Sequence, residues 1–151
     1  MVFCWGFYTD MTKIFTIGFS GKKPDVFLEV LDAARISCVW DIRLWRISTY
    51  VPYYNGDNLA AVLENRYEYH PEFAPSGEIL AGYKDKKLSW CGFEQKYHEL
   101  LNTRNPLQNC DIDKLDRICL LCTEKTADMC HRRLAAEYIA AKIPDVEIVH
   151  L

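Results

Sequence analysis

The chain lacks the features that would place it in several common classes of protein. It has no excess of positive charge, because 18 lysines and arginines stand against 21 aspartates and glutamates. No global positive field therefore attracts nucleic acid or an anionic membrane. Residues 1–7 are apolar, but this run is short and has no positive charge before it, so we expect neither a signal peptide nor a membrane span. Repeats, low-complexity tracts and linkers are also missing, and 151 residues suit one domain.

The cysteines do not form the pattern of a disulfide framework. There are seven, an odd number, and several lie inside apolar runs such as residues 118–122. Half of the residues are hydrophobic, enough to bury a core without disulfides or a structural metal. We therefore expect reduced thiols and a cytoplasmic protein.

Segments with strand-like composition alternate with helical patterns along the chain. The expected strands are residues 13–18, 36–42, 66–70, 117–122 and 145–151. The expected helices are residues 24–35, 58–65 with Asp57 as N-cap, about 89–105, and 131–142. Residues 71–87, with two prolines and two glycines, predict a long surface loop.

This alternation predicts an α/β fold with a mostly parallel sheet of about five strands and helices on both faces, a Rossmann-like three-layer arrangement. The single α/β domain is expected over residues 13–151. Residues 1–12 are expected to be an N-terminal extension, either disordered or forming an extra strand. In such sheets ligands bind beyond the carboxyl ends of the strands. The ends that carry polar groups are Gly18–Ser20, Asp41–Arg43 and Cys122–Glu124.

The segment from Cys122 to the helix at residue 131 is the strongest candidate site. Free backbone N–H groups and a partial positive charge at a helix start stabilise an anion, and Arg132 offers a bidentate clamp. Arginines at a helix start are otherwise unfavourable by roughly 0.3–1 kcal/mol each. They predict that something anionic is held there, either Glu124 or a ligand. Glu124 is also a candidate general base, or the residue that orients His131.

Other interpretations of the same segment remain open. A Glu124–Arg132 ion pair would be purely structural. Cys122 at a strand end facing a helix start has the setting of a reactive thiol, and with Cys130 it could form a redox pair. Cys122, Cys130 and His131 are also competent zinc ligands. An adjacent cysteine and histidine rarely chelate one ion together, however, so we assign no metal site. The sequence leaves the cofactor unknown.

Two further groups of residues extend the candidate site. Asp41 and Arg43 lie two apart at a strand end and point to the same side. They form either an ion pair or a substrate-positioning pair, and they lie close to Ser20 if the first two strands are neighbours. The loop that contains Ser20 is compatible with phosphate, but it is neither a Walker loop nor a dinucleotide fingerprint. Aromatic residues in the loops, such as Trp45, either stack a base or pack the loops onto the sheet.

These motifs resemble the domain of unknown function 488 family. The resemblance rests on Thr16–Ser20, Asp41–Arg43, Cys122–Glu124, Cys130–Arg132 and the terminal strand, and it extends from about residue 13 to 151. Here Phe19 stands where a histidine is common, which removes any role for a histidine in the first loop. The resemblance implies this fold, this site and a prokaryotic-type cytosolic protein. The family has no established activity, so it supplies no reaction.

The sequence thus predicts a domain that binds a small anionic ligand, and it leaves open whether the domain is an enzyme. That ligand would be a phosphate-bearing or nucleotide-like molecule or a nucleic-acid fragment, bound at the carboxyl edge of the sheet. The candidate catalytic residues are Glu124, Asp41 and His131, and the candidate ligand-binding residues are Ser20, Arg43, Arg132, Cys122 and Cys130. The alternatives are a non-enzymatic interaction module with a structural ion-pair network, and a thiol-redox or metal site at Cys122 and Cys130. Membrane partners are not expected, and a homodimer is left open.

Overall fold

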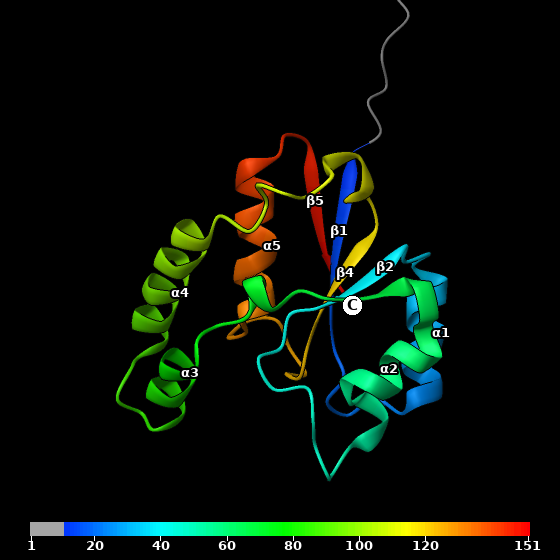
Figure 1. Ribbon diagram of the computed structural model, residues 1–151, viewed down its shortest axis with the longest axis horizontal. Helices are drawn as coiled ribbons and strands as arrows, with labels where there is room; N and C mark the ends of the chain where they lie inside the picture. Colours follow the sequence, from blue (N-terminus) through cyan, green and yellow to red (C-terminus); the bar gives the residue numbers. More distant parts are fainter. Residues whose placement is uncertain (1–10) are drawn as a thin grey trace, which may run out of the picture.

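A five-stranded parallel sheet is the middle layer of the structure, a computed structural model that describes residues 11–151 (Figure 1). Its strands are β1 (Thr12–Gly18), β2 (Cys38–Asp41), β3 (Tyr67–Tyr69), β4 (Ile118–Cys122) and β5 (Val146–His150). Their order in the sheet is β3-β2-β4-β1-β5, and every pairing is parallel. The predicted parallel sheet is confirmed. An N-terminal extension was predicted for residues 1–12, and residues 1–10 of it lie outside the described residues.

Helices cover both faces of this sheet. They are α1 (Pro24–Ala33), α2 (Gly56–Leu63), α3 (Gly77–Lys84), α4 (Trp90–Arg104) and α5 (His131–Lys142), with short 3₁₀ turns at Pro52–Tyr54, Glu64–Arg66, Pro71–Phe73 and Ile112–Lys114. Figure 1 shows α1 and α2 on one side of the sheet and α3, α4 and α5 on the other. No helix within residues 11–151 is both long and apolar enough to cross a membrane.

The central strand β4 is covered by helices on both faces, and this explains why its side chains are apolar on both sides. Ile118 and Leu120 belong to the core shared with α4 and α5, whereas Cys119 and Leu121 belong to the core shared with α1 and α2. Successive side chains of a strand point to opposite faces, so a strand covered on both faces must be apolar throughout. Every residue of β4 is buried, as this account requires.

Several boundaries differ from the sequence-based prediction, and one predicted loop contains a helix. Helix α2 begins at Gly56 with Asn55 as its N-cap, two residues before the predicted start. The predicted loop over residues 71–87 contains helix α3, because the Ser76 hydroxyl accepts a hydrogen bond from the Ile79 N–H and Ile79 packs into the core. The prolines and glycines of this segment flank the helix or are tolerated within it.

The strand order also changes the expected surroundings of Ser20. Strands β1 and β2 are not neighbours, because β4 lies between them. The chain leaves β1 for α1 on one face and leaves β4 for α5 on the other (Figure 1). Adjacent strands that send their connections to opposite faces form the switch point where parallel sheets bind ligands.

Gly18, the last residue of β1, permits a close approach at this switch point. A Cβ atom there would lie 1.6 Å from the Glu124 carbonyl oxygen and 2.7 Å from an Arg132 guanidinium nitrogen. We predict that Gly18→Ala lowers the free energy of unfolding by about 1–3 kcal/mol or more, because it overpacks backbone that cannot move aside. Urea unfolding measures the change. In the control Gly77→Ala, the new Cβ would meet nothing closer than 3.9 Å, so stability should hold or rise slightly. Equal losses in the two variants would contradict this account.

Candidate functional site

A cleft opens where the carboxyl ends of β2 and β4 meet the start of α5. Its volume is about 450 Å³. The residues that line it are Arg43, Leu44, Trp45, Leu80, Tyr83, Lys84, Trp90, Phe93, Cys122, Thr123, Glu124, Met129, Cys130 and His131. Elements far apart in the sequence therefore contribute to one concave surface, which is the usual form of a ligand site.

Two thiols and an imidazole meet at the floor of this cleft. Cys130 donates its thiol hydrogen to Cys122, with the two sulfur atoms 3.1 Å apart. The Nδ1 atom of His131 lies 3.6 Å from the sulfur of Cys122. All three residues are buried. Cys122 reaches this point because it ends β4, and the other two because they lie at the start of α5.

The surroundings of Cys122 favour its thiolate. The hydrogen bond from Cys130 lowers the pKa of Cys122 well below its ordinary value, and the positive charge of His131 and the Glu124 backbone N–H add to this against the effect of burial. The same hydrogen bond raises the pKa of Cys130, which keeps its proton. Burial alone would lower the pKa of His131, but the nearby Cys122 thiolate outweighs it and raises that pKa.

His131 is held in one orientation by a second hydrogen bond. Its Nε2 atom lies 2.9 Å from the carbonyl oxygen of Ile42, to which it donates. The ring of Tyr97 packs edge-on against the imidazole, with the ring centres 6.0 Å apart. This arrangement directs Nδ1 toward the thiols.

Arg132 is nearly fully buried and holds the loop after β4 by hydrogen bonds to its backbone. Its guanidinium donates to the carbonyl oxygens of Glu124 at 2.6 Å and Lys125 at 3.5 Å, and its Nε donates to the Thr16 hydroxyl at 3.3 Å. No salt bridge joins it to a carboxylate among residues 11–151. The Glu124–Arg132 contact thus uses the backbone of Glu124, while the exposed Glu124 side chain lines the cleft.

Asp41 and Arg43 form a buried, bidentate ion pair. The Nε and one terminal nitrogen of Arg43 lie 2.8 and 2.7 Å from the two carboxylate oxygens of Asp41. The Tyr67 hydroxyl donates to the same carboxylate at 2.7 Å, and Arg43 also donates to the Tyr54 carbonyl oxygen at 2.7 Å. This network fixes the segment that follows β2, and it leaves one side of Arg43 on the cleft wall.

The structure brings together five of the eight predicted site residues. Those that line the cleft are Arg43, Cys122, Glu124, Cys130 and His131. Asp41 and Arg132 lie behind them as supports. Ser20 lies beyond β4, where its N–H donates to the Thr123 carbonyl oxygen.

The walls that α3 and α4 contribute to the cleft were not predicted from the sequence. These walls carry Leu80, Tyr83, Trp90 and Phe93. Ser76 as an N-cap, followed by apolar residues at 79, 80 and 83, was the signal that could have revealed α3.

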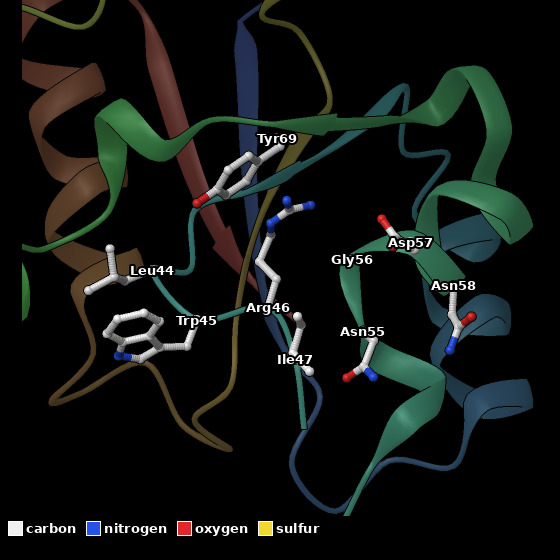
Figure 2. A pocket seen from close by; sticks show the side chains of 9 residues that line it. All are labelled: Leu44, Trp45, Arg46, Ile47, Asn55, Gly56, Asp57, Asn58 and Tyr69. Carbon is white, nitrogen blue, oxygen red and sulfur yellow. The ribbon is translucent and has the colours of Figure 1, made fainter. Parts of the chain in front are cut away.

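A second hollow adjoins this cleft and shares Leu44 and Trp45 with it (Figure 2). Figure 2 shows Arg46 between Tyr69 and the segment Asn55–Asn58. The Arg46 guanidinium lies 3.7 Å from the centre of the Tyr69 ring and donates to the Tyr67 hydroxyl at 3.2 Å. Because no thiol or imidazole lines this hollow, we regard the cleft as the candidate site.

The contribution of the buried Asp41–Arg43 ion pair to the free energy of unfolding can be tested. We predict that Asp41→Asn costs about 3–5 kcal/mol of unfolding free energy, because it leaves the Arg43 charge buried without a partner. The matched control is Asp32→Asn, which breaks the exposed Asp32–Arg66 pair and should cost about 0–1 kcal/mol. Urea unfolding of both variants measures the difference. Similar costs in the two would show that Asp41 and Arg43 do not hold this segment together.

Comparison with known proteins agrees with the motifs. No curated protein and no solved structure matches the chain. A family described as Domain of unknown function DUF488 matches residues 23–139, which include β2, β4, most of α5 and all residues that line the cleft. The chain therefore belongs to the DUF488 family.

Proposed function

We infer that the cleft binds a small molecule that combines a planar ring with an anionic group, as nucleotides and related phosphate-bearing molecules do. The observation that carries this inference is the meeting of aromatic walls with a helix start and cationic side chains in one cleft. Each half of the ligand would find a matching surface, and the two surfaces are adjacent.

The walls are suited to a planar ring. Trp90 and Phe93 stack with their ring centres 4.9 Å apart, and Tyr83 meets both of them edge-on. Trp45, on the segment after β2, is 72% exposed although it borders the cleft. An exposed tryptophan at the edge of a cleft is available to stack, and stacking on an aromatic side chain contributes about 1–3 kcal/mol per base.

The helix start and its neighbours are suited to an anion. Helix α5 has no side-chain cap, and the Arg133 N–H of its first turn donates to the Cys130 carbonyl oxygen. The helix dipole favours negative charge at this end. His131, Arg43 and Lys84 line the same cleft. Arg132 adds a buried positive charge beneath the loop, without a carboxylate partner among residues 11–151.

The place of each residue in or behind the cleft indicates its role in binding or catalysis. Glu124, with its exposed carboxylate at the cleft, is the candidate for accepting or donating a proton. His131 is the second candidate, and Arg43 and Lys84 would hold the anion. Asp41 has no exposed surface, so it acts by positioning Arg43.

We predict that a panel of nucleoside phosphates raises the melting temperature of the protein, whereas the corresponding free nucleosides raise it less. Trp45→Ala should weaken binding roughly tenfold, since it removes one stacking surface. Lys84→Ala should weaken the binding of nucleoside phosphates and leave the binding of free nucleosides unchanged. Thermal shift identifies the ligand, and calorimetry then gives the dissociation constants.

The control is Tyr53→Ala, which removes an aromatic side chain that is 68% exposed and does not line the cleft. It should bind like the wild type. If no member of the panel stabilises the protein, or if Tyr53→Ala and Trp45→Ala behave alike, the cleft is not a nucleotide site. In that event the non-enzymatic interaction module becomes the better account.

A further inference from the structure

We propose that Cys122, Cys130 and His131 bind one divalent transition-metal ion, with Zn²⁺ the best match, on the floor of the cleft. This goes beyond ligand binding by the cleft and does not depend on it. The sulfur and nitrogen atoms of the three residues all lie within 4.8 Å of one another. A pair of thiols with an imidazole is a donor set that zinc prefers over the hard cations Mg²⁺ and Ca²⁺.

One distance between the ligand atoms matches a tetrahedral ion, and a second requires a small adjustment. With Zn–S near 2.3 Å and Zn–N near 2.0–2.1 Å, tetrahedral angles place sulfur and nitrogen ligands ~3.6 Å apart and two sulfur ligands ~3.8 Å apart. The Cys122 sulfur lies 3.6 Å from His131 Nδ1. The two sulfur atoms are 3.1 Å apart and would need to separate by ~0.7 Å, which a small side-chain rotation provides.

The groups around the three residues are those that support metal ligands. A ligating histidine usually donates its other ring N–H to a carbonyl or carboxylate, which fixes the tautomer, and His131 Nε2 donates to the Ile42 carbonyl oxygen in this way. Arg132 directs an N–H at the Cys130 sulfur at 3.6 Å. Metal binding would displace the Cys130 proton to solvent, and the two thiolates would then balance the charge of a divalent ion, so a buried site needs no further carboxylate.

Three protein ligands leave a fourth coordination position. All three ligands line the cleft, so this position faces the space in which a substrate would lie. Catalytic zinc sites have this form, whereas structural zinc sites are closed by four protein ligands. A metal here would bind and polarise an oxygen atom of a molecule in the cleft. The exposed carboxylate of Glu124 lines the same cleft and is available to move a proton near that oxygen.

The test is titration of the reduced, full-length protein with Co²⁺, a spectroscopic substitute for Zn²⁺. We expect one equivalent to bind, with thiolate-to-cobalt charge-transfer absorption and the visible bands of a tetrahedral ion, and Zn²⁺ to displace it. Cys122→Ser and Cys130→Ser should each weaken binding by more than the roughly 10- to 100-fold that follows loss of an outer hydrogen-bond partner. Cys91→Ser, which removes an exposed thiol that does not line the cleft, should bind as the wild type does.

A second measurement needs no variant. Zn²⁺ should protect Cys122 and Cys130 of the wild type from alkylation and leave Cys91 reactive, as read by mass spectrometry of the labelled peptides. The proposal is overturned if Co²⁺ gives no thiolate absorption, if both serine variants bind like the wild type, or if Zn²⁺ protects neither thiol. A Cys122–Cys130 disulfide in the protein as purified, with no metal uptake after reduction, would also overturn it and would favour the thiol-redox alternative. These results are independent of the nucleotide panel, which is run on protein treated with a chelator.

Discussion

The rest of the site depends on the hydrogen bonds that the buried guanidinium of Arg132 donates. A cation buried this completely is strongly unfavourable unless its N–H groups are satisfied, and here backbone carbonyl oxygens and the Thr16 hydroxyl satisfy them. Those bonds tie the loop after β4 to the first turn of α5, and the missing side chain of Gly18 leaves the space that they need. The path of this loop in turn sets where Cys122 and Glu124 face. A change at Arg132 would therefore alter the whole floor of the cleft.

The arginines near the carboxyl ends of β2 and β4 divide between support and site. Arg132 holds a loop, Arg43 is fixed by Asp41 while it still borders the cleft, and Arg133 pairs with Glu94 and Glu137. Beside Arg43, the polar and ionisable groups that face the cleft include the two thiols, the imidazole, the Glu124 carboxylate and Lys84. Ion pairs and the hydrogen bonds of Arg132 thus support a small group of chemically versatile side chains, which is how a site is kept in one geometry.

Local signals in the sequence predicted the five strands and the helices other than α3 within residues 11–151, but not the order of the strands in the sheet. Strands with apolar runs are recognisable one at a time, whereas the position of β4 between β1 and β2 depends on which faces the connecting helices cover. Local signals also did not reveal that the adjacent residues Cys130 and His131 bring their side chains to one point. Cys130 is the N-cap of α5, with extended backbone at φ −133°, while His131 is the first residue of the helix. The change of backbone conformation between them lets two adjacent side chains face one point, which neither a regular strand nor a regular helix allows.

The two parts of the site differ in how freely they can change. The floor consists of buried residues on β4 and α5 whose neighbours are core residues, so a substitution there also disturbs packing. The walls include exposed side chains such as Trp45 and Lys84, where a substitution usually alters stability by only about 0.5 kcal/mol. Variation of the walls would therefore change which molecule fits the cleft without changing the chemistry at its floor. This separation follows from burial alone, and it holds whether the three floor residues act as metal ligands or as free thiols and an imidazole.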